Sequence, residues 1–200
     1  MNAPAKSELT RQRILSKGRE LVLTGGFGGV GLSRILAHSE VPKGSFYYYF
    51  SSKEDFGCAL LQDYVDEYLS RFDALANGPD KAGDKLSAFF AAWLDESRSE
   101  GIASRCLVVK LAAEIADLSE DMRAILDHGV ALLTGRIADL LTAGASDGSI
   151  RSLADPASTA RVLYAQLLGA AILSKLAQDD APLRDALADA KARLCPETSI

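Results

Sequence analysis

The 200-residue sequence predicts an all-α fold, and two observations carry that prediction. Apolar residues recur at helical spacing along most of the chain, as at Leu126, Val130, Leu133 and Ile137. The alternating β-branched runs that are typical of strands are missing. Glycines, prolines and capping residues divide the chain into about nine helices, expected at residues 8–24, 32–39, 43–49, 53–76, 80–99, 104–116, 120–143, 156–178 and 182–193.

Local signals mark the ends of these helices. Stops are expected at Gly25, Gly101 and Gly144, because glycine accepts the left-handed backbone conformation that ends many helices. Ser119 and Asp155 are expected to cap new helices, since each precedes acidic residues or a proline in a first turn.

The composition is that of an ordinary globular protein, with 48% apolar and 24% charged residues. The N-terminal residues lack the apolar core of a secretion signal, and no uncharged apolar run reaches about 18 residues, so no membrane contact is expected. Three widely spaced cysteines, Cys58, Cys106 and Cys195, are typical of a reducing cytoplasm rather than of a disulfide scaffold.

The net charge of −5 hides an asymmetry along the chain. Residues 1–56 carry eight Lys and Arg against five Asp and Glu, whereas residues 57–200 carry fourteen against twenty-two. A small basic segment joined to a larger acidic one favours a phosphate-bearing partner at one end, although an excess this modest also arises by chance.

Two short helices near the N-terminus predict a helix-turn-helix. The expected helix 32–39 ends at the break Glu40-Val41-Pro42, and the helix 43–49 starts directly after it. Two short helices around a turn of three or four residues, resting on a longer first helix, form the arrangement whose second helix enters the major groove of DNA.

The second of these helices carries five consecutive aromatic residues, 46–50. Phe46 and Phe50 lie four residues apart, so they share a helix face that we assign to the core. The remaining positions are expected to be exposed and comprise Lys43, Gly44, Tyr47, Tyr48 and Tyr49. Exposed phenol rings in a row suit contacts with base methyl groups and phosphates, and the alternative is a tyrosine-rich protein interface.

Lys53 follows as a candidate phosphate ligand. The run Ser51-Ser52-Lys53-Glu54-Asp55 predicts a capped helix start, in which the helix dipole favours the acidic residues and disfavours the lysine. Beside the backbone N–H groups of that turn, a lysine would instead complete a phosphate clamp. The alternative is a lysine that is simply solvated.

Residues 10–56, TRQRILSKGRELVLTGGFGGVGLSRILAHSEVPKGSFYYYFSSKEDF, resemble the DNA-binding domain of the TetR family of repressors, most specifically in KGSFYYYFSSKE. The resemblance implies a bacterial, cytoplasmic, nucleoid-associated homodimer. In it, residues 1–56 form the helix-turn-helix domain that binds a palindromic double-stranded operator, and residues 57–200 form a helical ligand-sensing and dimerisation domain. By position it assigns base contacts to Lys43, Gly44, Ser45 and Tyr47, phosphate contacts to Tyr49 and Lys53, and the groove edge to Ser33 and Arg34.

One residue departs from this family pattern. Pro42 stands where the family more often has a polar residue that caps the recognition helix. Proline suits a first helical turn, so the fold is unaffected, but one hydroxyl contact with DNA is in doubt.

Dimerisation is expected through the helices 120–143 and 156–178, which are apolar on more than one face and include small residues such as Gly169.

Residues 106–126, CLVVKLAAEIADLSEDMRAIL, and the later DGSI at 147–150 resemble the ligand domain of NemR- and AcuR-type members of that family. The resemblance implies a response to reactive electrophiles or to small unsaturated metabolites. It makes Cys106 the sensing thiol and Lys175, in the last long helix, a nearby cation.

The residues around Cys106 favour the same role. Ser104 is expected to cap a helix, so Cys106 would lie in its first turn, with Arg105 adjacent and Lys110 one turn further. A helix N-terminus and nearby cations stabilise the thiolate, which is the form that reacts with electrophiles and oxidants. The alternative is that Cys106 is a small buried core residue.

The sequence contains no pattern that predicts the active site of an enzyme. Residues 26–31, GFGGVG, match the dinucleotide pattern GxGxxG, but that motif follows a strand, and here a helix precedes it. His38 and His128 lack partners at metal-ligand spacing, so no metal and no cofactor are expected.

Together these features predict a DNA-binding repressor that a small electrophile or oxidant releases through Cys106. A reversible ligand in a pocket near Trp93 and Tyr164 is the alternative inducer. A helical interaction protein without DNA is the remaining class, and retention on heparin would separate it from a DNA-binding protein.

Overall fold

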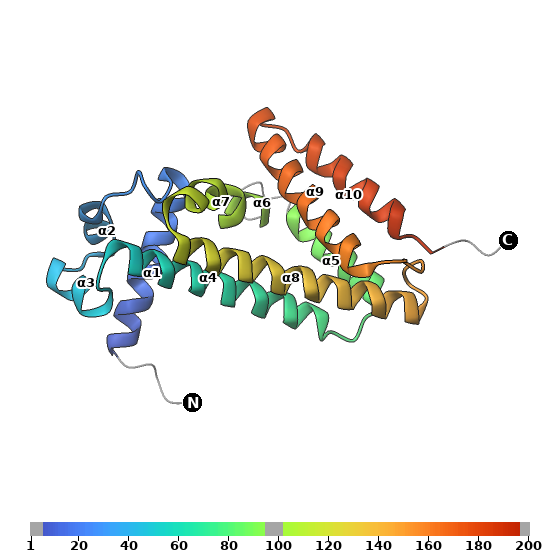
Figure 1. Cartoon of the computed structure of the whole chain (residues 1–200), viewed down its shortest axis with the longest axis horizontal. Coiled ribbons are helices and arrows are strands. Elements are labelled where there is room, and N and C mark those ends of the chain that lie inside the picture. The colour runs from blue at the N-terminus through green and yellow to red at the C-terminus, as the bar shows by residue number, and fades with distance from the viewer. Residues whose placement is uncertain (1–5, 95–101, 197–200) are drawn as a thin grey trace. The chain divides into compact units, whose positions relative to one another are not determined.

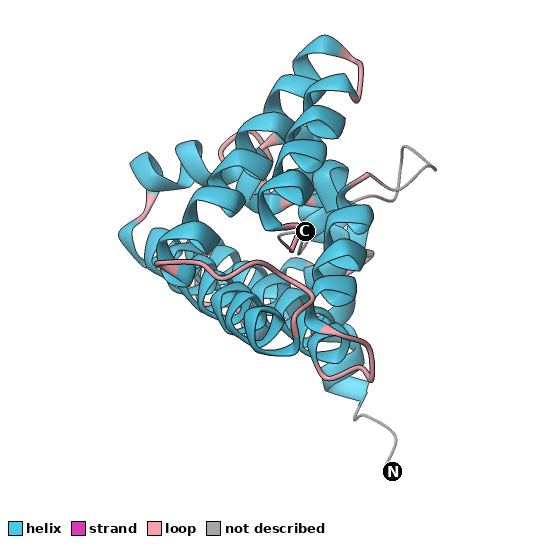
Figure 2. Ribbon diagram, turned by 90° about the vertical axis from the view of Figure 1, so that its right-hand side faces the viewer, coloured by secondary structure: helices cyan, strands magenta, loops and turns pink. Residues whose placement is uncertain are grey.

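The computed structural model describes residues 6–94 and 102–196, and within these ranges it contains ten helices and no strand (Figure 1, Figure 2). In chain order they are α1 (Lys6–Gly25), α2 (Leu32–Ser39), α3 (Lys43–Tyr49), α4 (Lys53–Ala76), α5 (Ala82–Trp93), α6 (Ile102–Arg105), α7 (Leu107–Leu118), α8 (Glu120–Asp147), α9 (Pro156–Ala177) and α10 (Ala181–Leu194). The predicted all-α fold is confirmed. The expected residues 95–99 of the fifth helix and the expected stop at Gly101 lie outside the described ranges.

The chain divides into two compact units. The first contains Met1–Glu67 and Lys110–His128, and the second contains Tyr68–Val109 and Gly129–Ile200. Helices α4, α7 and α8 therefore each contribute residues to both units. The predicted boundary after residue 56 divides the chain by function, and that division remains a prediction.

Helix ends in the first unit follow backbone and side-chain caps. α1 is followed by Gly26 with φ +74°, and α2 ends at Glu40 in the left-handed conformation with φ 55°. At the start of α4, the Ser52 hydroxyl accepts a hydrogen bond from the Asp55 N–H at 2.9 Å, and Asp55 accepts one from the Ser51 N–H at 2.7 Å. These reciprocal contacts confirm the predicted capped start of this helix.

Buried aromatic rings join α3 to α4. Phe46, Phe50 and Phe56 are each at most 1% exposed. Their ring centroids lie between 5.2 and 5.6 Å apart, in tilted or edge-on geometry. Phe46 and Phe50 therefore lie in the core, as predicted from their spacing.

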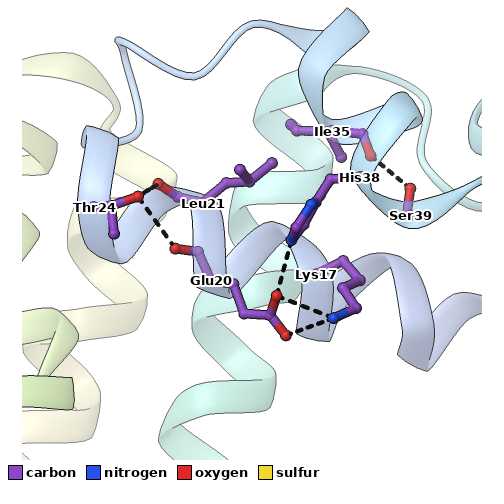
Figure 3. A network of polar contacts seen from close by, with 7 residues as sticks. All are labelled: Lys17, Glu20, Leu21, Thr24, Ile35, His38 and Ser39. Atoms are coloured by element: carbon purple, nitrogen blue, oxygen red, sulfur yellow. Dashed lines mark hydrogen bonds and ion pairs between the residues drawn. The ribbon is translucent and has the colours of Figure 1, made fainter. Parts of the chain in front are cut away.

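Figure 3 shows a polar network between α1 and α2. The Glu20 carboxylate accepts a hydrogen bond from Lys17 at 2.9 Å and lies 2.8 Å from Nε2 of His38. The contacts with Lys17 and then His38 hold the pKa of the Glu20 carboxyl below its usual range. His38 is exposed, and its partner is a carboxylate on the neighbouring helix.

The turn between α7 and α8 is fixed by Ser119. Its hydroxyl accepts a hydrogen bond from the Met122 N–H at 3.3 Å, which confirms that Ser119 caps α8, and donates one to Glu54 of α4 at 2.5 Å. Gly57 of α4 lies close by, since a Cβ there would be 2.5 Å from Met122 Sδ and 2.6 Å from the Phe27 ring. Ser119 and Met122 are therefore packed closely against the first turns of α4.

In the second unit, the DGSI sequence at 147–150 caps another helix. Asp147 accepts a hydrogen bond from the Ala82 N–H at 3.0 Å, and the Ser149 hydroxyl accepts one from the Gly83 N–H at 2.8 Å. Both donors belong to the first turn of α5, whose N–H groups have no partner within their own helix. The structure thus gives this sequence a structural role.

The predicted helix end at Gly144 is wrong, because α8 continues to Asp147. A Cβ at residue 144 would lie 2.5 Å from the side chain of Ile150. Glycine at this position makes room for Ile150, and the turn is made later by Gly148, with φ +75°.

α9 and α10 pack against each other as a helical hairpin (Figure 1). Asp155 caps α9, as predicted, by accepting a hydrogen bond from the Ser158 N–H at 2.8 Å. One face of α9 is buried, whereas the apolar side chains of Val162, Ile172, Leu173 and Leu176 are exposed.

By length and composition alone, α9 could also cross a membrane, with 39% of its most apolar window buried. The sequence criterion of an uninterrupted uncharged run excluded it, because Arg161 and Lys175 limit that run. A core helix meets the same length and composition test.

Candidate nucleic-acid interface and effector site

α3 presents a polar and aromatic surface to solvent. Lys43 Nζ lies 5.9 Å from the centroid of the Tyr47 ring, which confirms that these residues share a face. Tyr47 is 46% exposed and Tyr48 is 76% exposed. Gly44 borders open space, since a Cβ there would meet no atom within 4 Å. Ser45 is half-buried on the same short helix.

Tyr49 differs from the other two phenols. It is half-buried, and its hydroxyl accepts a hydrogen bond from the Ser7 hydroxyl at 3.3 Å. The expectation of three equally exposed phenols is therefore wrong for Tyr49, because its position in the helix turns the ring toward α1. Ser33 and Arg34 of α2 are both exposed.

Lys53 is held by the loop between α1 and α2. Its ammonium donates a hydrogen bond to the Phe27 carbonyl at 2.8 Å and lies 4.7 Å from the centroid of the Phe27 ring. Burial lowers the pKa of Lys53, and the charge of Glu114 acts in the opposite direction. The alternative of a lysine that is simply solvated is therefore wrong.

The predicted helix 104–116 is two helices, and Cys106 lies between them. Ser104 belongs to α6, so it does not cap the helix that follows. Instead the Cys106 sulfur accepts a hydrogen bond from the Val109 N–H at 3.5 Å and takes the N-cap place of α7. Its side chain is buried, with 2% exposed.

Two phenols lie close to this thiol, that of Tyr164, which is buried, and that of Tyr68, which is half-buried with a buried hydroxyl. Burial raises the pKa of Tyr68 and of Tyr164, and the charge of Cys106 raises both further. Arg105 and Lys110 were the cations expected beside this thiol. Arg105 is exposed, and the Lys110 ammonium donates a hydrogen bond to the Thr24 carbonyl at 3.5 Å.

A cavity of about 250 Å³ lies in the second unit. Trp93, Ser104 and Lys175 are among the residues that line it. The Trp93 ring packs edge-on against Tyr164 with centroids 6.2 Å apart, but of the residues predicted near a pocket only Trp93 lines this cavity, and Tyr164 and Cys106 are not among its described lining residues. The indole Nε1 of Trp93 is buried and has no hydrogen-bond partner among the described residues.

Residues 26–31 form the turn between α1 and α2, so their GxGxxG match has no dinucleotide-binding context. The N–H groups of Phe27 and Gly28 donate to Glu114, a residue of the stretch 106–126 to which no role was assigned from the sequence. Within residues 6–94 and 102–196, no group of His, Cys, Asp and Glu side chains could hold a metal ion.

A helix-turn-helix with an exposed polar and aromatic second helix, joined to a helical unit with a cavity, defines a ligand-responsive DNA-binding regulator. Residues 14–56 match the family described as "Bacterial regulatory proteins, tetR family", and residues 82–190 match "Tetracyclin repressor-like, C-terminal domain". The chain belongs to the TetR family. Its relatives are transcriptional repressors and not enzymes.

The chain is similar to the HTH-type transcriptional repressor NemR of Escherichia coli (strain K12), with 40% identity over 91% of this chain and 92% of that protein. It is 31% identical to the transcriptional regulator AcuR of Cereibacter sphaeroides, over 88% of this chain and 81% of that protein. The crystal structure of the reduced form of E. coli NemR has a TM-score of 0.89 at 39% identity, covering 95% of this chain and 99% of that one. The chain is therefore a TetR-family transcriptional repressor homologous to NemR.

Proposed function

We propose that this repressor binds a palindromic operator as a homodimer and is released when a reactive electrophile or an oxidant modifies Cys106. The observation that carries the proposal is the place of the Cys106 sulfur at the N-cap of α7, in contact with the Val109 N–H. The N–H groups of a first helical turn stabilise a thiolate, and a thiolate adds to electrophilic carbon or is oxidised. The E. coli NemR structure was solved in a reduced form, which supports including oxidants among the inducers tested.

On the DNA side, α3 enters the major groove and α2 flanks it. Base edges are contacted by Lys43, Gly44, Ser45, Tyr47 and Tyr48, phosphates by Tyr49 and Lys53, and the groove edge by Ser33 and Arg34. The exposure of Ser33, Arg34, Lys43, Gly44, Tyr47 and Tyr48 supports the assignment, whereas Ser45, Tyr49 and Lys53 are half-buried. Lys53 also retains capacity for a phosphate, since an ammonium has three N–H donors and the carbonyls of Phe27 and Gly28 take two.

The dimer forms through α8 and α9. The exposed apolar side chains of α9, together with Leu132 of α8, supply a surface that a second copy would cover. Gly135 and Gly169 have no atom within 4 Å of an added Cβ, so two helices can approach closely there. Two such helices per subunit make a four-helix bundle. This bundle holds the two α3 recognition helices of the dimer about 34 Å apart on DNA. The repressor then acts at the nucleoid in the bacterial cytoplasm.

Modification of Cys106 acts through packing. An adduct adds bulk to a buried site, and packed cores switch between discrete arrangements rather than deform continuously. The resulting shift moves α4 and changes the spacing of the two recognition helices, one α3 from each subunit. Lys175 is the proposed partner, which stabilises the thiolate or reacts with its oxidised form.

The three cysteines supply a matched experiment. Cys106→Ser should bind a duplex selected by the wild-type protein, but a quinone or hypochlorite should no longer release it. Cys58→Ser and Cys195→Ser should be released like the wild type. Burial and then nearby carboxylates raise the pKa of Cys58, which disfavours its thiolate, and Cys195 is exposed. Release of Cys106→Ser at the wild-type rate would refute the thiol switch.

A reversible ligand in the cavity beside Trp93 is the second candidate. The cavity and the unpartnered indole N–H favour it, because a ligand acceptor could satisfy that donor. Trp93 is the single tryptophan of the chain, so its fluorescence reports on this cavity alone. A reversible inducer should change the fluorescence of Cys106→Ser and be removed by gel filtration, whereas a Cys106 adduct should persist.

A further inference from the structure

The loop between α1 and α2 closes around the carboxylate of Glu114 on α7. The Phe27 N–H donates to Oε2 at 3.1 Å, and the Gly28 N–H donates to Oε1 at 2.6 Å. Both oxygens of one carboxylate are therefore engaged by adjacent backbone amides, in charge-assisted hydrogen bonds. All of these residues belong to the first compact unit.

The glycines of this loop make the contact possible. Gly26 has φ +74°, and a Cβ there would lie 2.9 Å from Glu114 Oε2. A Cβ at Gly28 would lie 3.0 Å from Oε1. The GFGGVG sequence thus serves as a cradle for a carboxylate from the same chain, which its match to a dinucleotide motif did not reveal.

The same loop residue orients Lys53. The carbonyl of Phe27 accepts the hydrogen bond from Lys53 at 2.8 Å, and its ring lies under the ammonium. A flexible lysine side chain is thereby held in one direction, which reduces the conformational entropy it would lose on binding a phosphate. Glu114 and Lys53 therefore contact opposite sides of the same residue, the first through its N–H and the second through its carbonyl and ring.

We propose that Glu114 is a positioning residue for DNA binding, which fixes the loop at Phe27 and Gly28 and so directs Lys53 to an operator phosphate. This inference rests on the proposed phosphate contact of Lys53. The loop also leads directly into α2, so its position sets where the first helix of the helix-turn-helix begins.

The direction in which Glu114→Gln changes the affinity for DNA separates this role from a purely electrostatic effect of the carboxylate. A carboxylate repels DNA phosphates, so neutralising it without any other effect strengthens binding. Glu114→Gln keeps the shape of the side chain, but its amide nitrogen cannot accept the second N–H. Removal of this negative charge should therefore weaken binding, about ten-fold, and reduce the slope of log affinity against log salt by about one unit as the Lys53 contact is lost.

Glu120→Gln is the matched control. It removes the same charge from an exposed carboxylate of the first unit, whose side-chain partner is Arg123. Its affinity for the same selected duplex should be unchanged or slightly higher. Glu114→Asp keeps the charge and shortens the reach, so it should weaken binding in the same direction by a smaller factor. If Glu114→Gln does not fold, the affinity of Glu114→Asp tests the positioning role in its place.

A double-mutant cycle with Lys53→Ala completes the test. If Glu114 acts through Lys53, the double variant should bind like Lys53→Ala alone. The positioning role alone would be overturned if the affinity losses of Glu114→Gln and Lys53→Ala multiplied in the double variant. It would also be overturned if Glu114→Gln bound as tightly as the wild type with an unchanged salt slope. If Lys53→Ala itself changes neither affinity nor slope, the phosphate contact fails and this inference fails with it.

Discussion

The sulfur of Cys106 accepts a hydrogen bond from the backbone N–H of Val109, and this contact makes a cysteine the cap of α7. Serine, threonine and aspartate are the usual residues at such a position. Cysteine gives a weaker acceptor but a much stronger nucleophile, so the helix start and the proposed sensor share one atom. Chemistry at the sulfur therefore removes a helix cap at the same time as it adds bulk.

This double role predicts different stabilities for two variants. Cys106→Ser keeps an acceptor for the Val109 N–H, so its free energy of unfolding should be higher than that of Cys106→Ala. Cys106→Ala should lose about 1 kcal/mol with the cap. Urea unfolding of the reduced proteins measures both. Equal stabilities of the two variants would show that the sulfur contributes no cap.

Lys43 and Tyr49 should affect DNA binding differently. Lys43→Ala should relax the preference at one base position, at a cost of roughly 1–3 kcal/mol there, because Lys43 faces a base edge in the proposed interface. Tyr49→Phe should weaken binding to all sequences alike, because it removes the proposed phosphate contact. Affinities for the selected duplex and for single-base variants of it separate the two patterns.

Two glycine-to-alanine variants should separate folding from DNA binding. At Gly57 a Cβ would lie 2.5 Å from Met122 Sδ, so Gly57→Ala should destabilise the protein by about 1–3 kcal/mol. At Gly44 the Cβ meets open space, so Gly44→Ala should keep or raise the melting temperature and weaken operator binding. Thermal unfolding and DNA titration of each variant check both statements, and full operator affinity of Gly44→Ala would remove that position from the interface.

Asp73 and Arg136 should give a pH-dependent contribution to stability. Two hydrogen bonds, at 2.6 and 3.0 Å, join the carboxylate to the guanidinium and hold the pKa of Asp73 below its usual range. A lowered folded pKa stabilises the protein above the ordinary aspartate pKa, about 3.9, and this contribution is lost as the pH falls through the folded value. Asp73→Asn should therefore be less stable than the wild type at pH 7, by at most about 1 kcal/mol because solvent screens the pair.

The difference between Asp73→Asn and the wild type should shrink below about pH 4, when the wild-type carboxylate becomes protonated. Asp127→Asn is the control, since its oxygen lies 3.8 Å from Arg123 and both side chains are exposed. That variant should match the wild type at every pH. A difference for Asp73→Asn that stayed constant down to pH 2 would contradict the ion-pair explanation.

Leu176 and Leu118 should differ in their effect on assembly. Both side chains are exposed, at 77% and 51%, but only Leu176 belongs to the proposed dimer surface on α9. Leu176→Glu places a charge in that surface and should shift the dimer toward monomer at micromolar concentration. Leu118→Glu should leave the sedimentation coefficient unchanged. A monomeric wild type that binds its operator tightly would refute the dimer itself.

The sequence was sufficient wherever structure depends on neighbours along the chain. The bounds of α2, α3 and α4 were predicted because the break at Pro42 and the Ser52–Asp55 cap act within a few residues. The buried positions of Phe46 and Phe50 followed from helical periodicity for the same reason. Charge asymmetry and the exposed phenols pointed to DNA, and the TetR family was recognisable from residues 10–56 alone.

Tertiary structure decided the features that join residues distant in sequence. Gly144 resembles a helix stop, yet it continues α8 because Ile150 occupies the space of its missing side chain. Glu114 lies in a stretch that resembles the family, but its hydrogen bonds are made only where α7 meets a loop 86 residues earlier in the chain. Hydrogen bonds and close packing act over a few ångströms in space, so no local pattern encodes them. The sequence determined most helix bounds and the aromatic character of α3, and the tertiary structure decided the break at Cys106 and the contacts of Glu114 with the loop before α2.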